Sequence, residues 1–289
     1  MLSIPYDATR ESLFHPGNAD DFFTHGPISS DAALCAEMAR LAYVKETSRL
    51  AQYLARADFD LVKPIGYESS GTQLFCAKSR GAAKSAAVVA FRGTEPDDPS
   101  DLFTDAKFAM TRWMVDGKVF GKVHVGFDAS FRSVFSTDQS LRELIPIGVD
   151  RVLFTGHSLG AALATLASSV LPSGHLYTFG SPLVGDEEFR RSMHDVDHSR
   201  YVDCCDLVTR VPPEFLGYAH VGGLRHIDRN GDVLSAPSNE AIEQDRREAA
   251  RAYLFKYALR RGTVAVRELA DHTPINYVSG VMGLRARDG

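Results

Sequence analysis

The chain has 289 residues, of which 44% are hydrophobic and 24% are charged. This is a globular composition with enough apolar material for one large core, and we expect a single α/β domain over residues 1–289 with residues 1–30 as an N-terminal extension. The formal net charge of -5 provides no broad basic surface, so nucleic acid is not an expected partner.

The start of the chain lacks the pattern of a secretory signal. Met1–Asp7 reaches an acidic residue before any apolar run develops, whereas a signal needs a basic start and a continuous apolar stretch. No run elsewhere approaches about 18 uninterrupted apolar residues, so we expect no transmembrane helix. Localisation stays open between the cytoplasm and export by a route that does not read an N-terminal signal.

Strands and helices are expected to alternate along the chain. Asp31 begins a helical pattern with Leu34, Met38 and Leu41 on one face. Short apolar runs rich in Val, Phe and Tyr predict buried strands. These runs are 73–77, 86–91, 151–155, 175–179 and 200–202, and helical patterns cover 159–171 and 187–193. Such alternation predicts a mainly parallel sheet with helices on both faces.

Two features are expected in the last third of the chain. The segment Arg229–Asp232 contains Asn-Gly, which accepts the positive φ of a two-residue hairpin connection, so a hairpin is predicted there. Residues 239–260 are charged and rich in Ala, which predicts an exposed amphipathic helix. We expect most of its charges to form a solvated face.

The four cysteines do not indicate a disulfide framework or a metal site. Cys35, Cys76, Cys204 and Cys205 are too few for such a framework, and adjacent cysteines rarely bond to each other. They also lack the paired spacing of a zinc site. Reduced cysteines are expected, with one bridge from Cys35 or Cys76 to a distant partner left open.

The segment Gly156-His157-Ser158-Leu159-Gly160 carries the chemistry of the chain. It lies between an expected strand and a helix rich in small residues, where a G-x-S-x-G serine occupies a sharp turn that lifts its hydroxyl clear of the sheet. Glycines are needed on both sides because side chains there would collide with the turn. Ser158 is therefore the predicted nucleophile, and a chance Gly/Ser turn is the alternative.

A serine nucleophile needs a histidine base and an acid that orients it. His272 is the preferred base because it lies on an expected loop after the last strands, in the chain order Ser, Asp, His. His220, in a run that resembles a strand, is the competitor, and the His157 side chain is expected to point away from the nucleophile. Asp206 is preferred as the acid because it follows a strand end, with Asp203 as the alternative.

These residues resemble the class 3 lipases, a family that contains the filamentous-fungal triacylglycerol lipases and has the α/β-hydrolase fold. Five segments carry the likeness: Val89–Thr94, Lys122–Phe127, Thr155–Ala164, Tyr177–Pro182 and Asp206–Pro212. They span residues 86–213, with a looser likeness out to His272. The first thirty residues and the charged helix near Ala250 do not resemble the fungal enzymes.

The resemblance implies several site residues. It assigns Ser158 as nucleophile, Asp206 as acid and His272 as base, and it implies an oxyanion hole built from Thr94 and Leu159. It also implies a mobile lid over about residues 95–121, whose Leu102 and Phe103 would contact substrate. A surface helix packed permanently on the core is the alternative for this segment, whose front is longer and more acidic than the fungal pattern.

The predicted activity is carboxylic ester hydrolysis, most simply a lipase or esterase acting on acylglycerols through a Ser-His-Asp triad and an acyl-enzyme. The alternatives are a phospholipase A1, an aryl esterase of the feruloyl type, or a catalytically silent lipid-binding module on a lipase scaffold. No cofactor or metal is required by this chemistry. The expected partner is an ester or lipid substrate at a lipid-water interface, and the sequence leaves the oligomeric state open.

Overall fold

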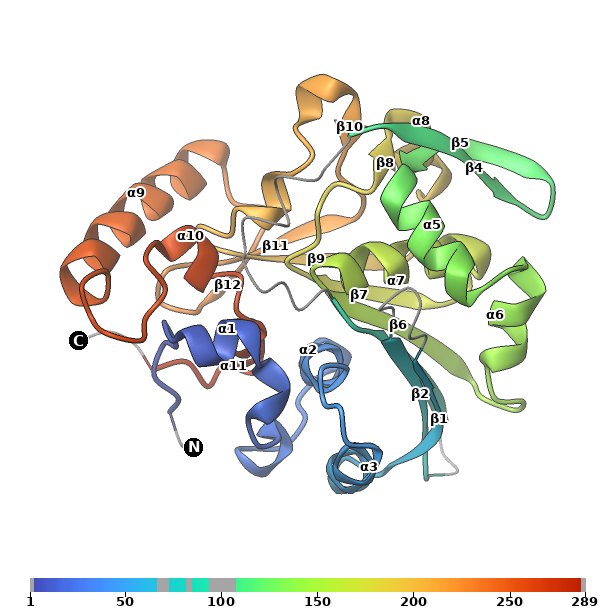
Figure 1. Cartoon of the computed structure of the whole chain (residues 1–289), viewed down its shortest axis with the longest axis horizontal. Helices are drawn as coiled ribbons and strands as arrows, with labels where there is room; N and C mark the ends of the chain where they lie inside the picture. Colours follow the sequence, from blue (N-terminus) through green and yellow to red (C-terminus); the bar gives the residue numbers. More distant parts are fainter. Residues whose placement is uncertain (1–2, 67–72, 82–84, 94–107, 287–289) are drawn as a thin grey trace.

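The computed structural model describes residues 3–66, 73–81, 85–93 and 108–286 of the chain. Within these residues the main element is an eight-stranded sheet with the order β1-β2-β3-β6-β7-β9-β11-β12 (Figure 1). The strands are β1 (Phe59–Gly66), β2 (Gln73–Ser79), β3 (Ala86–Phe91), β6 (Arg151–His157), β7 (His175–Phe179), β9 (His198–Asp203), β11 (Gly223–Ile227) and β12 (Val233–Ser235).

The middle of the sheet is parallel and its edges are antiparallel. Strands β3, β6, β7, β9 and β11 run parallel to their neighbours in this set. The edge strands β1, β2 and β12 pair antiparallel. All residues of β3 are buried, and so are all but the first of β6. Their continuous apolar sequence follows from this burial, because both faces of a parallel sheet are covered.

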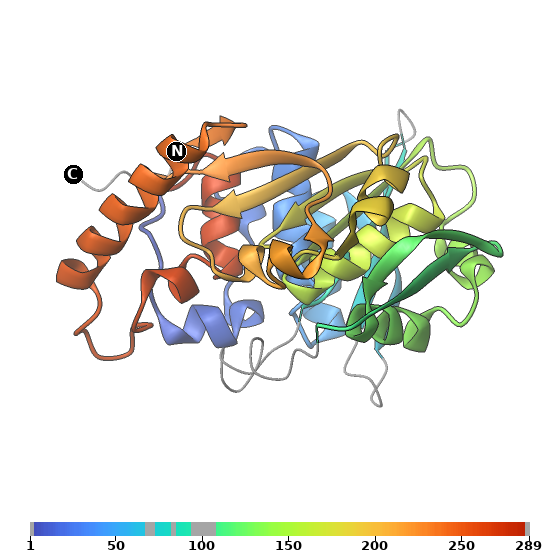
Figure 2. The ribbon, with the colours of Figure 1, turned by 90° about the horizontal axis from the view of Figure 1, so that it is seen from above.

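Helices cover both faces of the sheet (Figures 1 and 2). On one face, Val89, Phe91 and Phe154 share a core with helices α5 (Val125–Val134), α6 (Asp138–Leu144) and α7 (Leu159–Val170). On the other face, Val88, Ala90 and Leu153 share a core with α2 (Asp31–Leu41), α3 (Thr47–Arg56) and α11 (Pro274–Val281). Adjacent strand residues thus supply opposite cores, as the alternation of side chains along a strand requires.

A second, four-stranded sheet lies beside the first, with the order β10-β8-β5-β4. Its strands are β4 (Met110–Val115), β5 (Lys118–His124), β8 (Gly185–Asp186) and β10 (Tyr218–Ala219). Trp113 of β4 is fully buried and stacks edge-on against Phe131 of α5. Residues 110–121 of the predicted lid segment therefore lie in a hairpin that packs on the core through Trp113.

The first thirty residues, from residue 3 onward, pack against the rest of the protein. They contain α1 (Arg10–Phe14) and the short 3-10 helices η1 (Pro16–Asn18) and η2 (Phe22–Thr24). Ile4 pairs with Arg285 at the other end of the chain. The Tyr6 hydroxyl donates to Asp271 Oδ1 over 2.6 Å, and both side chains are buried. The extension therefore supports the loop that contains residue 272.

The last third of the chain contains α8 (Glu187–Ser192), η3 (Val208–Arg210), η4 (Glu214–Leu216), α9 (Asn239–Lys256) and α10 (Arg267–Ala270). The predicted hairpin is present as β11 and β12, but residues 228–232 connect the strands, so the predicted two-residue turn was wrong. Asp228 Oδ1 accepts the amides of Asn230 and Asp232, over 2.8 and 2.9 Å, and this side chain organises the longer turn. Only Gly231 of the Asn-Gly pair has a positive φ.

All four cysteines are buried and free. Among the described residues, none of the helices combines the length and the apolar character needed to cross a bilayer.

Candidate active site

Ser158 occupies the turn between β6 and α7, with φ 58° and ψ -129°. Residues other than glycine rarely adopt this backbone conformation. It costs about 1–3 kcal/mol, and the residues that adopt it cluster at functional sites. The Ser158 amide donates to the carbonyl oxygen of Phe179 at the end of β7, over 3.0 Å. The turn is thus held by the neighbouring strand, and the strain is confined to the predicted nucleophile.

The two glycines of the motif allow α7 to approach the sheet. A Cβ on Gly156 would overlap the carbonyl group of Gly160, and a Cβ on Gly160 would overlap the carbonyl oxygen of Phe91. Because both obstacles are backbone atoms, neither contact could be relieved by a side-chain rotation. The G-x-S-x-G spacing is therefore a packing requirement of this strand-to-helix crossing.

The structure brings Ser158, His272 and Asp206 into one hydrogen-bonded chain. His272 Nε2 lies 2.9 Å from Ser158 Oγ, and His272 Nδ1 lies 2.9 Å from Asp206 Oδ2. All three are buried, with exposed fractions of 2%, 4% and 0% in that order of naming. With Nδ1 as the donor to the carboxylate, Nε2 is the atom that accepts the serine proton.

Asp206 is held by donors from two other elements. Its Oδ1 accepts the amide of Val208 over 2.9 Å, and its Oδ2 accepts the hydroxyl of Tyr277 on α11 over 2.5 Å. Burial and the neighbouring Asp206 carboxylate raise the pKa of the Tyr277 phenol, so the phenol stays protonated as a donor. These bonds hold the Asp206 carboxylate in place beside the imidazole of His272.

Asp203, the alternative acid, has a different set of partners. Its carboxylate pairs with Arg285 over 2.6 Å and accepts the amide of Cys204 over 2.9 Å. Its own amide donates to the Tyr277 hydroxyl over 3.0 Å. Asp203 thus joins the end of β9 to the C-terminal segment, while Asp206 lies against His272.

His157 lies closer to the site than the sequence indicated. Its ring centroid is 4.5 Å from that of His272, a contact with the predicted base that the sequence did not indicate. Its Nδ1 lies 2.9 Å from the Tyr43 hydroxyl. Burial, followed by the neighbouring His272, holds the pKa of His157 well below the ordinary value, so the His157 ring is neutral. The His157 ring therefore packs against His272 without adding a positive charge beside it.

Three predicted site residues lie outside the described residues, namely Thr94, Leu102 and Phe103. The remaining one, Leu159, is the first residue of α7. Amides in the first turn of a helix have no intrahelical acceptor, so the Leu159 N–H is positioned at a terminus suited to an anion.

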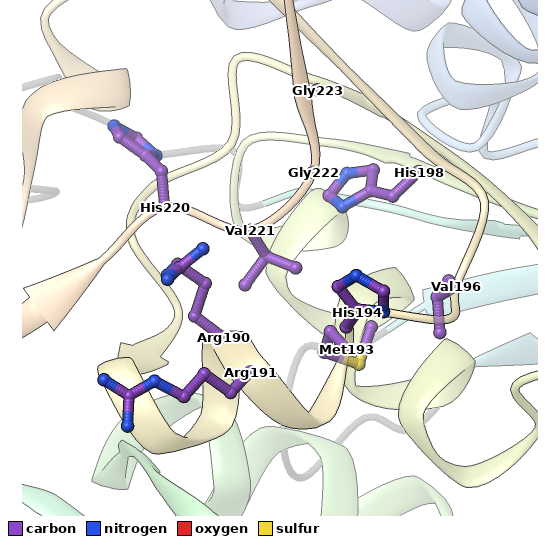
Figure 3. A pocket seen from close by; sticks show the side chains of 10 residues that line it. All are labelled: Arg190, Arg191, Met193, His194, Val196, His198, His220, Val221, Gly222 and Gly223. Atoms are coloured by element: carbon purple, nitrogen blue, oxygen red, sulfur yellow. The ribbon is translucent and has the colours of Figure 1, made fainter.

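His220, the competing base, lines a different cavity (Figure 3). This cavity, of about 550 Å³, lies between the end of α8, the start of β9 and the segment between β10 and β11. His194 and His198 also line it, whereas Ser158, Asp206 and His272 do not. Burial lowers the pKa of His220 to about 3. The sequence placed His220 in a run that resembles a strand, and strand β10 ends at Ala219, one residue before it.

Two buried groups combine residue types that could hold a metal ion: Cys204, Cys205 and Asp271, and Cys204, His226 and Asp245. The carboxylates in both groups already have close partners. Asp245 lies 3.1 Å from Cys204 Sγ and 2.9 Å from Arg229 Nη1. Asp271 accepts the Tyr6 hydroxyl and the Cys205 amide. These contacts account for the clustering of the side chains by hydrogen bonding, and we assign neither group a role in metal binding.

Two supporting contacts were missed in the sequence, those of Tyr277 with Asp206 and of Tyr6 with Asp271. The partners are separated by 71 and 265 residues. Nothing local in the sequence marks such long-range pairs.

A Ser-His-Asp chain at the carboxyl ends of parallel strands, with the serine at a strand-to-helix turn, defines the α/β-hydrolase fold. Residues 88–216 match the family model described as Lipase (class 3). This part of the chain, which contains Ser158 and Asp206, is therefore similar to the class 3 lipases.

Individual relatives agree with this similarity to the class 3 lipases. The chain is 32% identical over 148 residues to a secreted mono- and diacylglycerol lipase A of Penicillium cyclopium, covering 47% of this chain and 46% of the relative. It is 34% identical over 105 residues to a phospholipase A1-II of Oryza sativa, covering 32% and 26%. The chain thus spans less than half the length of these two curated relatives.

A solved structure supports the fold over a longer stretch. The crystal structure of a mono- and diacylglycerol lipase from Aspergillus oryzae superimposes with a TM-score of 0.56 and 26% identity. The match covers 72% of this chain and 80% of that one.

Proposed function

We propose that this protein is a serine ester hydrolase that cleaves acylglycerols through an acyl-enzyme. The observation that carries the proposal is the continuous chain from Ser158 Oγ through His272 to Asp206, with 2.9 Å at each link. His272 Nε2 removes the serine proton as Oγ attacks the ester carbonyl, and Asp206 stabilises the resulting imidazolium. His272 then returns that proton to the departing alcohol.

The second half of the reaction uses the same groups in reverse. Water loses a proton to His272 as it attacks the acyl-enzyme, and Ser158 recovers its proton when the fatty acid leaves. The tetrahedral oxyanion of each step needs amide donors, and we assign this role to Leu159 and Thr94. Losing one such donor typically costs about 100- to 1,000-fold in rate.

The acylglycerol substrate class rests on the relatives. The Penicillium relative and the Aspergillus structure both have names that specify mono- and diacylglycerols. In the proposal, part of the segment 95–121 covers the acyl group, with Leu102 and Phe103 in contact with it. Residues 110–121 of that segment belong to the hairpin of β4 and β5.

Replacement of the nucleophile tests the proposal. Ser158→Ala should reduce hydrolysis of a soluble p-nitrophenyl ester to near background and abolish labelling by a fluorophosphonate probe. Ser168→Ala is the matched control, because Ser168 is a buried serine of the same helix without a described hydrogen-bond partner. It should retain activity and labelling. Activity above a few per cent in folded Ser158→Ala would contradict the assignment.

Phospholipid hydrolysis at the A1 position is the second candidate, because a relative from Oryza sativa is named a phospholipase A1. A panel of monoacylglycerols, diacylglycerols, triacylglycerols and phosphatidylcholine distinguishes the two. We expect the highest kcat/KM on the partial acylglycerols. A preference for the phospholipid would replace the acylglycerol assignment while leaving the serine mechanism in place.

A further inference from the structure

The C-terminal end of α9 presents large apolar side chains to solvent. Leu254, Phe255 and Leu259 are exposed by 60%, 89% and 98%. Helix α9 lies at one end of the molecule, at the left of Figure 1 and far from α6. Single exposed apolar residues are common on proteins, but three within six positions, at the end of α9 and directly after it, call for an explanation.

Aromatic packing on the inner face of α9 keeps the side chains of Leu254 and Phe255 on the outer face. Tyr253 is buried, and its hydroxyl donates to the carbonyl oxygen of Val264 over 2.6 Å. Its ring packs edge-on against Tyr6, and the Tyr257 ring lies 5.7 Å from the same Tyr6 ring. Because Tyr253 and Tyr257 occupy the inner face, Leu254 and Phe255 cannot turn inward without displacing them.

The charged residues within the segment 251–261 have a single sign. Residues 251–261 contain the four basic residues Arg251, Lys256, Arg260 and Arg261, all exposed, and no acidic residue. The whole chain has a formal net charge of -5, so this concentration is local. The acidic residues of α9 lie in its first part, at Glu240, Glu243, Asp245 and Glu248.

This combination matches one kind of partner. Apolar side chains bordered by basic ones bind an anionic lipid surface, where the apolar groups enter the acyl region and the cations meet the headgroups. A two-fold dimer through the same residues would place the two basic clusters opposite each other, which opposes self-association. Charge complementarity therefore favours lipid over a second copy of the chain.

We propose that residues 251–261, here called the α9 patch, dock the protein on anionic lipid surfaces. Phe255 and Leu259 enter the lipid, and Arg260 and Arg261 contact the headgroups. The patch lies outside the segment 88–216 that matches the lipase family. Docking through it requires no catalysis, so it is independent of the ester hydrolase activity proposed above.

Vesicle binding of a catalytically inert protein tests the proposal. Ser158→Ala protein is sedimented with vesicles of phosphatidylcholine containing phosphatidylglycerol, and with phosphatidylcholine alone. We expect binding to the anionic vesicles that weakens as salt is raised. Adding Phe255→Ser and Leu259→Ser should weaken it at least tenfold. Adding Arg260→Glu and Arg261→Glu should also weaken it at least tenfold, since each basic residue contributes about fivefold near an anionic surface.

The matched control is Ile147→Ser, which removes an isolated apolar side chain with 97% exposure elsewhere on the surface. It should leave vesicle binding unchanged. Patch variants made with Ser158 intact should hydrolyse the soluble p-nitrophenyl ester at the wild-type rate, which shows that they are folded and keeps the two proposals separate. Three results would each overturn docking. They are no binding of the Ser158→Ala protein to anionic vesicles, a loss of binding in Ile147→Ser equal to that of the patch variants, or a dimer in solution that the patch variants disrupt.

Discussion

At the scale of single residues, the site depends on a side chain that touches no reacting atom. Tyr277 donates to Asp206 Oδ2 and accepts the amide of Asp203, over 2.5 and 3.0 Å. It therefore fixes the distance between the end of β9 and the turn that contains the acid. In the proposed mechanism Tyr277 is a positioning residue, because it acts on His272 only through Asp206.

Tyr277→Phe tests this role while keeping the ring. We expect kcat to fall about tenfold with KM little changed, corresponding to about 1.4 kcal/mol. The reason is that Asp206 Oδ2 keeps only His272 Nδ1 as a partner once the Tyr277 hydroxyl is removed. Tyr201→Phe is the matched control, since Tyr201 also packs against Phe179 and has no described contact with the triad. Equal effects on kcat in the two folded variants would contradict the role of Tyr277.

The three residues of the hydrogen-bonded chain could be selected from the sequence because each has a local signal. Ser158 lies in a spaced motif, Asp206 follows a strand end, and His272 comes last in the required chain order. Tyr277 and His157 have no such signal. Their contacts depend on how α11 and the end of β6 meet in three dimensions, which periodicity along the chain does not specify.

At the scale of elements, the crossing of β6, α7 and the end of β3 leaves no room beside Gly160. Gly160→Ala should lower the free energy of unfolding by about 1–3 kcal/mol, because the added methyl group meets the carbonyl oxygen of Phe91. Urea unfolding measures this change. Gly26→Ala is the control, since a Cβ there would meet nothing within 4 Å. A stability loss no larger than that of Gly26→Ala would show that the crossing can relax.

Elements with a continuous apolar sequence were the ones that the sequence predicted well. β3 and β7 have the predicted bounds, 86–91 and 175–179. β1 was missed because it contains Lys63 and Pro64 and a register shift between Leu61 and Lys63, features tolerated at a sheet edge. The β4 and β5 hairpin was not predicted, because residues 95–121 were assigned to a lid from the family resemblance. The burial of Trp113 depends on helix α5, which follows the hairpin in the chain.

At the scale of the whole molecule, buried neutral histidines make stability depend on pH. His198 is buried, its Nε2 lies 2.8 Å from Thr178 Oγ1, and burial lowers its pKa to about 3. In the unfolded chain histidine has a pKa of about 6.5. Between these values the unfolded state binds more protons, so the free energy of unfolding falls as the pH decreases from about 6.5 to 3.

His198→Gln should reduce this dependence by up to about 1.4 kcal/mol per pH unit in that window. Unfolding in urea at a series of pH values measures the slope for each variant. His194→Gln is the control, because the side chain of His194 is 88% exposed. An unchanged slope in His198→Gln would show that the pKa of His198 is the same in the folded and the unfolded protein.

The pairing of the two ends of the sequence has a consequence for synthesis on the ribosome. Tyr6 and Asp271 are 265 residues apart, and Ser158 and His272 are 114 apart. The serine turn is thus translated before His272, and the loop that contains His272 packs on Tyr6, which is translated earlier than both. In the proposed mechanism a nascent chain has no esterase activity until residue 272 has emerged and its loop has folded against Tyr6.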